Sequence, residues 1–258
     1  YGLVGSEMCI RDRCLIIRCA ATKTVIAHAL PCKGVDEDAY VSRLVVADLE
    51  WLGHTKLILK ADNEPALQAV VRDVVRRATA EVKTIEAISK EEPAAYDIQS
   101  NGLVEVGVLL VKGLFRTLKL CFESRIERRV PVGHALIPWL LEHTCLVLNT
   151  TSIGPDGQTA WQRARGRPFT QRLAYFGEKI MVKLPMKGPR SEPDGNTGAR
   201  WVEALYLGQS LQANVHIASS LAGGDILRSR SLYRRPASER WDADALAALQ
   251  ATPGSERA

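Results

Sequence analysis

One short segment carries much of the information about the fold: Leu57-Ile58-Leu59-Lys60-Ala61-Asp62-Asn63-Glu64. Its apolar residues predict a buried strand over residues 56–61, and Asp62 stands where that strand ends. Pro65 follows at a position that suits the first turn of a helix. Asp62 therefore has two interpretations, as a helix N-cap that accepts backbone N–H bonds or as a functional carboxylate.

A second segment has a comparable character: Gln99-Ser100-Asn101-Gly102-Leu103-Val104-Glu105. It predicts a polar, Gly-containing start to a long helix that runs from Asn101 to about Arg128, with Glu105 in the first turn. The helix dipole alone favours an acid there. Paired with Asp62, however, Glu105 is also a suitable oxygen ligand for a hard divalent cation such as Mg²⁺.

Lys112 lies two helical turns after Glu105 and so on the same face of the predicted helix. It is either a solvated lysine or a contact for a nucleic-acid phosphate beside a metal. The neighbouring residues 108–111 are apolar, which favours a mostly buried helix whose lysine points to an open cleft.

The rest of the chain divides by pattern into two parts. Up to Gly154 we expect α/β layers with a mixed sheet: a hairpin (14–21 and 24–30), helices (36–52, 65–78 and 131–149), a short strand (81–85) and a mobile loop (89–100). After Gly154 we expect a short helix (159–165), then short strands (179–184, 201–207, 214–218 and 226–233) that indicate a small β-barrel or sandwich.

Composition narrows the class of protein. The six cysteines form no Cys-x-x-Cys pair, which favours free thiols in a reducing compartment. No apolar run approaches the ~20 residues of a membrane helix, and the start lacks the apolar core of a secretory signal. We therefore expect an intracellular protein, nuclear or cytoplasmic, without a membrane partner.

Charge is uneven along the chain. Residues 160–240 carry 14 Lys and Arg against 6 Asp and Glu, whereas the net charge of the whole chain is only +5. This distribution suggests contact with a polyanion, and a solvated charged surface is the alternative.

The two carboxylate segments, in this order, resemble the catalytic core of retroviral and retrotransposon integrases, which has a ribonuclease-H-like fold. The likeness is strongest to Copia-like elements. It extends over about residues 14–241, through motifs at Ile26–Gly34, Thr159-Ala160-Trp161, Phe176-Gly177-Glu178-Lys179, Leu205-Tyr206-Leu207-Gly208 and Arg228-Ser229-Arg230-Ser231.

This resemblance implies DNA integration by strand transfer of a 3′ end into target DNA, dependent on Mg²⁺ or Mn²⁺. It implies metal ligands at Asp62 and Glu105, and a multimer acting on element ends and target DNA. The implied DNA contacts are Lys112, Asn101, Arg163, Arg165, Arg167 and Arg172.

The sequence departs from the family at its start. The family's first catalytic Asp belongs to an opening strand, but residues 1–8 contain no Asp, and Asp12 would fall at the start of the next strand. We expect a truncated, catalytically impaired protein, with a non-native leader (1–13), a core without its first strand (14–153), a basic linker (154–172), a DNA-contacting barrel (173–241) and a flexible tail (242–258). A non-catalytic DNA-binding module and a ribonuclease-H-like nuclease are the alternatives.

Overall fold

The computed structural model describes residues 2–5, 13–30, 34–35, 38–91, 102–185 and 198–254. The chain folds into two compact units. The first comprises Tyr1–Leu114 and Val147–Phe169, and the second comprises Phe115–Leu146 and Thr170–Arg257. The chain passes from one unit to the other within α3 (Gly102–Ile126), within α4 (Leu136–Thr151) and after Phe169, so the units do not divide at the expected boundary near residue 153.

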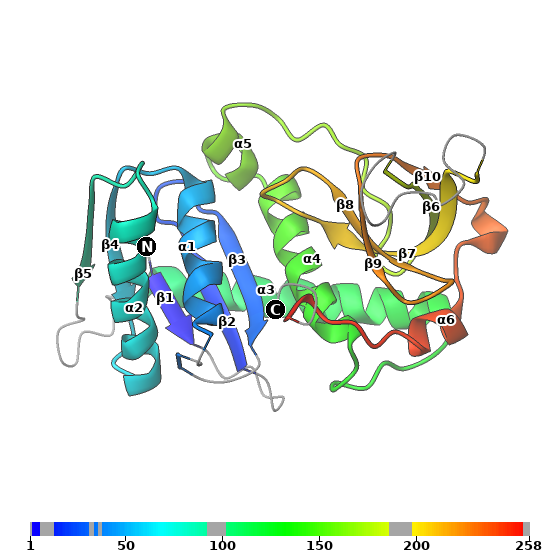
Figure 1. The fold of residues 1–258 in the computed structure, drawn as a ribbon, viewed down its shortest axis with the longest axis horizontal. Helices are drawn as coiled ribbons and strands as arrows, with labels where there is room; N and C mark the ends of the chain where they lie inside the picture. The colour runs from blue at the N-terminus through cyan, green and yellow to red at the C-terminus, as the bar shows by residue number, and fades with distance from the viewer. Residues whose placement is uncertain are drawn as a thin grey trace. The chain divides into compact units, whose positions relative to one another are not determined.

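The first unit contains a mixed five-stranded sheet in the order β3-β2-β1-β4-β5 (Figure 1). The strands are β1 (Gly2–Gly5), β2 (Arg13–Arg18), β3 (Val25–Leu30), β4 (Lys56–Ala61) and β5 (Ala87–Glu91). Strands β3, β2 and β1 are antiparallel, whereas β1, β4 and β5 are parallel. The expectation that the core lacks an opening strand is thus wrong, because residues 2–5 pair with both β2 and β4.

Two helices cover one face of this sheet: α1 (Tyr40–Leu52) and α2 (Pro65–Glu81) lie side by side, with the first half of α3 behind the sheet (Figure 1). Apolar residues at helical spacing turn inward, and Val45, Leu49 and Val71 are fully buried. Helix α1 ends at residue 52, as predicted. Gly53 follows in a left-handed conformation (φ 73°) that lets its N–H reach the carbonyls of Leu49 and Glu50.

Two predictions between α2 and α3 fail. The expected strand at 81–85 does not form, because α2 continues to Glu81 and the strand is β5. The expected loop at 89–100 overlaps β5 at residues 89–91, and residues 92–100 lie outside the described part of the chain. Strand β5 is hard to detect in the sequence because it is an edge strand with polar, exposed positions.

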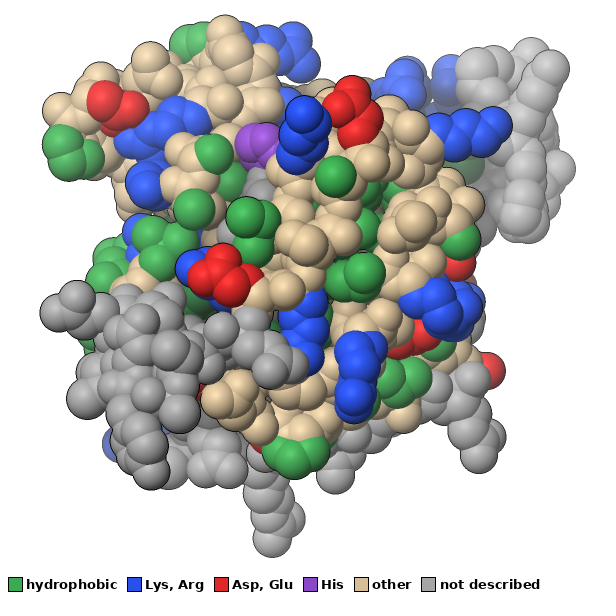
Figure 2. Space-filling model, turned by 90° about the vertical axis from the view of Figure 1, so that its left-hand side faces the viewer, with side chains coloured by type: hydrophobic (Ala, Val, Ile, Leu, Met, Phe, Trp, Pro, Cys, Tyr) green, Lys and Arg blue, Asp and Glu red, His purple; other side chains and the backbone are tan. Residues whose placement is uncertain are grey.

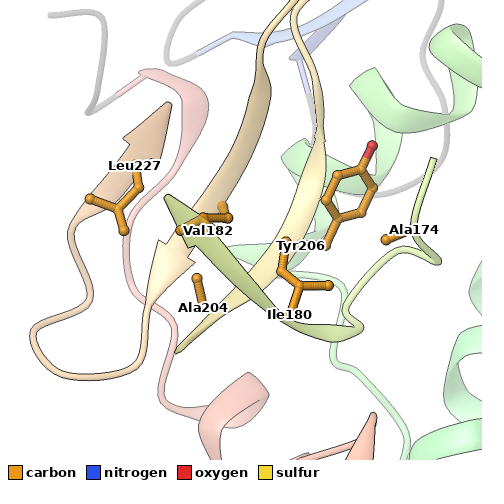
Figure 3. Packing of buried hydrophobic residues seen from close by; sticks show 7 residues of the cluster. Ala174, Ile180, Val182, Ala204, Tyr206 and Leu227 are labelled. Atoms are coloured by element: carbon orange, nitrogen blue, oxygen red, sulfur yellow. The ribbon is translucent and has the colours of Figure 1, made fainter. Parts of the chain in front are cut away.

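The second unit contains a five-stranded antiparallel sheet in the order β10-β6-β7-β8-β9. Its strands are β6 (Lys179–Lys183), β7 (Trp201–Gln209), β8 (His216–Ser220), β9 (Ile226–Ser229) and β10 (Leu232–Arg234). Small and apolar side chains form its core, including Ile180, Val182 and Tyr206 (Figure 3). Among the described residues, the ladder does not close into a barrel.

Residues 237–254 contain regular structure and buried side chains. A 3₁₀ turn (η1, Ala237–Glu239) precedes α6 (Ala243–Ala247), and Leu246 and Leu249 are buried. The indole Nε1 of Trp139 donates to the carbonyl of Ala251 at 2.8 Å. The expectation of a flexible tail is therefore wrong for residues 243–254.

Two expectations from composition can be compared with the described residues. The four cysteines among them, Cys14, Cys19, Cys121 and Cys145, form no disulfide with one another. None of the helices in the part of the chain that is described has both the length and the apolar character needed to cross a bilayer.

Candidate functional site

Strand β4 delivers Asp62 to the edge of the first sheet. Leu57, Leu59 and Ala61 are buried, so the strand is fixed by its apolar side chains, and Asp62 follows at partial exposure. The Gln68 side chain donates to the carbonyl of Asp62 at 2.7 Å and holds the turn into α2. The N-cap residue of α2 is Glu64, without a side-chain capping bond, so the N-cap interpretation of Asp62 is wrong.

Helix α3 brings Glu105 near Asp62. Glu105 is exposed in the first turn of α3, as the sequence predicts. The pKa of Asp62 is raised, first by burial and then by the negative charges of Glu105 and Glu64. The two carboxylates that the sequence singles out therefore lie close enough to repel one another.

This arrangement suits a divalent cation, because a cation would offset both the repulsion and the burial of Asp62. Carboxylate oxygens are the hard donors that Mg²⁺ and Mn²⁺ accept. Within the described residues, however, no group of three or more His, Cys, Asp or Glu side chains is placed to hold a metal. The described site thus presents two carboxylates, Asp62 and Glu105, at the positions where the sequence predicts metal ligands.

The pairing of β1 with β4 determines which residue of β1 would lie beside Asp62. Gly2 is in register with Lys60, and Leu3 with Ala61. Continued by one residue, this parallel register sets Val4 beside Asp62. The sequence has no acidic residue among positions 2–5.

The predicted nucleic-acid contacts Lys112 and Asn101 have different outcomes. Lys112 is partly exposed and forms no ion pair or hydrogen bond with the described residues, so its ammonium is available. It shares a helix with Glu105 at a spacing of two turns. Asn101 lies outside the described residues.

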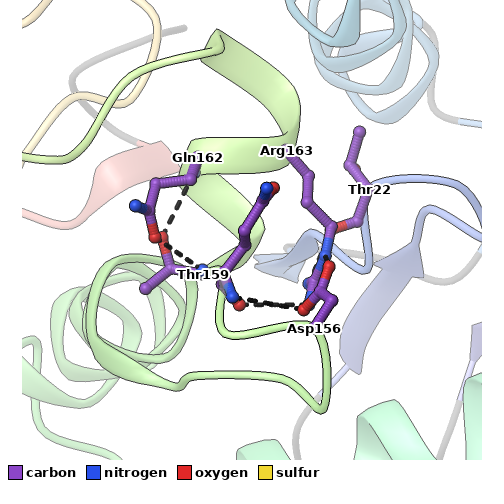
Figure 4. A network of polar contacts seen from close by, with 6 residues as sticks. Thr22, Asp156, Thr159, Gln162 and Arg163 are labelled. Carbon is purple, nitrogen blue, oxygen red and sulfur yellow. Dashed lines mark hydrogen bonds and ion pairs between the residues drawn. The ribbon is translucent and has the colours of Figure 1, made fainter.

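The sequence predicts a basic linker over residues 154–172. Residues 154–169 of this segment belong instead to the first unit. Helix α5 (Ala160–Arg165) begins with a capping box between Thr159 and Gln162 (Figure 4). The Trp161 ring packs against Trp51, with 6.2 Å between ring centroids. The segment is therefore part of the packed structure.

The four predicted arginine contacts divide into two pairs. Arg163 is held by Asp156, with 2.8 Å between Nε and Oδ2 (Figure 4), and Arg165 donates to the carbonyl of Trp51 at 2.9 Å and stacks on its ring. These two guanidinium groups have structural partners. Arg167 and Arg172 are exposed and form no ion pair with the described residues.

The face of the molecule in Figure 2 shows Lys and Arg side chains dispersed among apolar and uncharged ones. Among the described residues in this view, the positive side chains do not gather into one continuous patch.

No protein-family model matches the sequence, and no curated protein matches it. The assignment of function therefore depends on the residues themselves and on the geometry of Asp62 and Glu105.

Sequence reasoning gives no role to Arg18, which interrupts an otherwise apolar strand. The structure buries it, with only 9% of the residue exposed. A charged residue at an inward position of a strand is the signal that could have drawn attention to it.

Proposed function

We propose that this chain is the integrase region of a Copia-like retrotransposon polyprotein, acting on DNA as a multimer. The observation that carries the proposal is the convergence of Asp62, at the end of β4, with Glu105, in the first turn of α3. Sequence context alone singles out both residues, and the charge of Glu105 contributes to the raised pKa of Asp62.

The fold supports the same proposal. A ribonuclease-H-like core predicts a hairpin, then alternating helices and strands in a mixed sheet, and the first unit has this sequence of elements. In the second unit the last strand, β10, returns to pair with the first, β6, which supports a barrel-type domain, although the edge strands β10 and β9 do not pair among the described residues. We therefore propose a ribonuclease-H-like core followed by a barrel-type domain.

In the proposed reaction, Asp62 and Glu105 bind Mg²⁺ or Mn²⁺ through carboxylate oxygens. When bound, such an ion activates a hydroxyl or water nucleophile and stabilises the leaving oxygen of a phosphodiester. Lys112 holds a DNA phosphate by its charge, and Arg167 and Arg172 add affinity for the backbone without selecting a sequence.

The same geometry explains why we expect impaired catalysis. Two carboxylates provide fewer anionic ligands than a two-metal centre normally has. The register of β1 with β4, extended by one residue beyond Leu3 and Ala61, sets Val4 beside Asp62. We propose that position 4 is where a third carboxylate would complete the site.

The test is a strand-transfer assay with a labelled element-end DNA and Mg²⁺ or Mn²⁺. We expect weak or no transfer by the wild type, a clear gain with Val4→Asp, and loss of that gain when Glu105→Gln is added. Val4→Asn is the matched control, because it has the same shape as Asp but carries no charge.

Two results would contradict the proposal. One is a Val4→Asp variant that folds and binds DNA but gains no transfer. The other is strong wild-type transfer that survives Glu105→Gln. Cleavage of RNA–DNA hybrids without strand transfer would instead support the ribonuclease-H-like nuclease.

A non-catalytic DNA-binding module is the second candidate, favoured by the excess of 14 basic over 6 acidic residues in 160–240 and by the exposure of Arg167 and Arg172. It predicts DNA affinity that is unchanged by Asp62→Asn and falls steeply with salt. Double substitution of Arg167 and Arg172 by Gln should weaken binding and reduce the salt slope by about two.

A further inference from the structure

Arg18 is a buried cation that pairs with no carboxylate among the described residues. Its Nη1 donates to the carbonyl of Leu103 at 2.7 Å, whereas its buried Nε has no hydrogen-bond partner in the described part of the chain. Burial of an unpaired charge is costly, and it lowers the pKa of this guanidinium.

The position of Arg18 is fixed by its packing against α3. A Cβ atom at Gly107 would lie 3.0 Å from Cδ of Arg18, so the arginine stem crosses the helix where a side chain is missing. Together with the bond to Leu103, this contact holds the guanidinium in place.

Arg18 lines a cavity of about 570 Å³ that lies entirely within the first unit. Its apolar walls come from Val25, Leu110, Leu148 and Ile153. This volume and lining are typical of a site for a small organic molecule.

Two of the polar side chains around the cavity already have protein partners and are not available to a ligand. Arg163 is neutralised by Asp156, whose pKa falls to about 2 through their hydrogen bonds (Figure 4). The Asn149 amide is used by the backbone of Val25, as donor at 2.7 Å and acceptor at 2.9 Å.

Lys23 adds a second positive charge at the rim. It lies in the turn between β2 and β3, is exposed, and forms no ion pair with the described residues. After Arg163 and Asp156 offset one another, Arg18 and Lys23 leave the cavity with a net positive charge.

We propose that this cavity binds a small organic anion, with its negative group at Arg18 and Lys23 and an apolar body against Val25, Leu110 and Ile153. The anion supplies a counter-charge to Arg18. The apolar walls select a ligand larger and less hydrated than an inorganic ion.

This site is separate from the Asp62 and Glu105 pair. Arg18 contacts α3 at Leu103 and Gly107, and each of these is two residues from Glu105. Residues two apart on a helix point to different faces, so the cavity and the carboxylate pair lie on different sides of α3.

The experiment is a calorimetric titration of the full chain with naphthalene-2-carboxylate, its neutral carboxamide and inorganic phosphate. We expect the carboxylate to bind at least tenfold more tightly than either of the others. Arg18→Gln should weaken carboxylate binding by about ten- to a hundredfold, since a charge-assisted hydrogen bond is lost. Lys83→Gln removes an exposed charge of the same unit away from the cavity and should change nothing.

Lys23→Glu provides a variant at an exposed turn, in case Arg18→Gln fails to fold, and should weaken carboxylate binding at least tenfold. Equal binding of carboxylate and carboxamide would overturn the proposal, as would equal binding of carboxylate and phosphate. Absence of carboxylate binding at millimolar concentration would also overturn it, and so would unchanged affinity in Lys23→Glu.

Discussion

The fully buried carboxylate of Glu178 accepts two hydrogen bonds from Arg234, at 2.8 Å from Nε and 2.7 Å from Nη2. Arg240 approaches the same carboxylate at 3.2 Å, and the Tyr175 N–H donates to it at 3.0 Å. Glu178 precedes β6 and Arg234 ends β10, so this group ties together two neighbouring strands of the second sheet.

The first prediction is that removing Arg234 destabilises the protein more than neutralising Glu178 does. Arg234→Met should cost about 3–5 kcal/mol of unfolding free energy, because it leaves a buried carboxylate with fewer partners. Glu178→Gln should cost less, because Arg234 is about one-third exposed and can be hydrated. Urea denaturation measures both.

Glu239→Gln serves as the control, since its pair with Arg235 is at the surface and should contribute less than about 1 kcal/mol. An Arg234→Met variant as stable as Glu239→Gln would show that the buried pair does not stabilise the second sheet.

The second prediction concerns metal binding by Asp62 and Glu105. Because the folded-state pKa of Asp62 is raised, its contribution favours folding at low pH and is lost as pH rises through that pKa. At neutral pH without metal, Asp62→Asn should therefore raise the melting temperature by a few degrees.

Mg²⁺ should raise the melting temperature of the wild type but not of Asp62→Asn or Glu105→Gln, measured by calorimetry. Glu86→Gln, at an exposed position of the same unit, should keep the response to Mg²⁺. The same Mg²⁺ response in all four proteins would rule out a site at these two carboxylates.

The third prediction is a loss of stability in acid that arises from His143. This residue is buried beside Phe176 and Tyr206, and burial lowers its pKa to about 4. The unfolded chain takes up a proton near pH 6.5, whereas the folded chain resists it down to about pH 4. Stability should fall over this range by up to about 3 kcal/mol.

His143→Phe keeps an aromatic ring without a titrating group, so it should flatten the dependence of unfolding free energy on pH between 6.5 and 4. If His143→Phe retains the wild-type slope, the buried imidazole is not the source of the acid sensitivity.

The fourth prediction compares two destabilising effects of a side chain at Gly177, backbone strain and steric overlap with Phe122. This residue has φ of 76°, and a Cβ there would lie 2.3 Å from Cε2 of Phe122. Gly177→Ala should therefore cost more than about 2 kcal/mol, because overpacking adds to the left-handed strain.

Gly224→Ala is the matched control, since Gly224 has φ of 75° but none of the described atoms lies within 4 Å of an added Cβ. It should cost only the strain, about 1 kcal/mol. Equal losses in thermal denaturation would mean that Phe122 moves aside without cost.

Elements with strong local signals can be predicted from the sequence. Strand β4 has the predicted bounds because an apolar run ends at Asp62 and Pro65 starts the next helix. Helix α5 is predictable for a similar reason, since Thr159 and Gln162 form a capping box within four residues.

Elements that depend on distant partners escape prediction. Strand β1 is short and begins and ends in glycine, and it exists because β2 and β4 pair with it on both sides. The end of the chain packs through Trp139, far away in sequence.

The candidate site also contains residues that local sequence signals identify and contacts that depend on distant partners. Asp62 and Glu105 are identifiable because each stands at the end or start of a strongly patterned element. The resemblance implies DNA contacts at Arg163 and Arg165, but the sequence does not show that Asp156 and Trp51 hold these two side chains.

The bond between Asn149 and Val25 has a consequence for behaviour at high concentration. Strand β3 is an edge of the first sheet, and such edges recruit strands from other molecules. The backbone N–H and carbonyl of Val25 both form hydrogen bonds with the side-chain amide of Asn149. The amide occupies the place of a neighbouring strand but offers no further backbone groups for pairing. This part of the edge is therefore protected against aggregation by sheet extension.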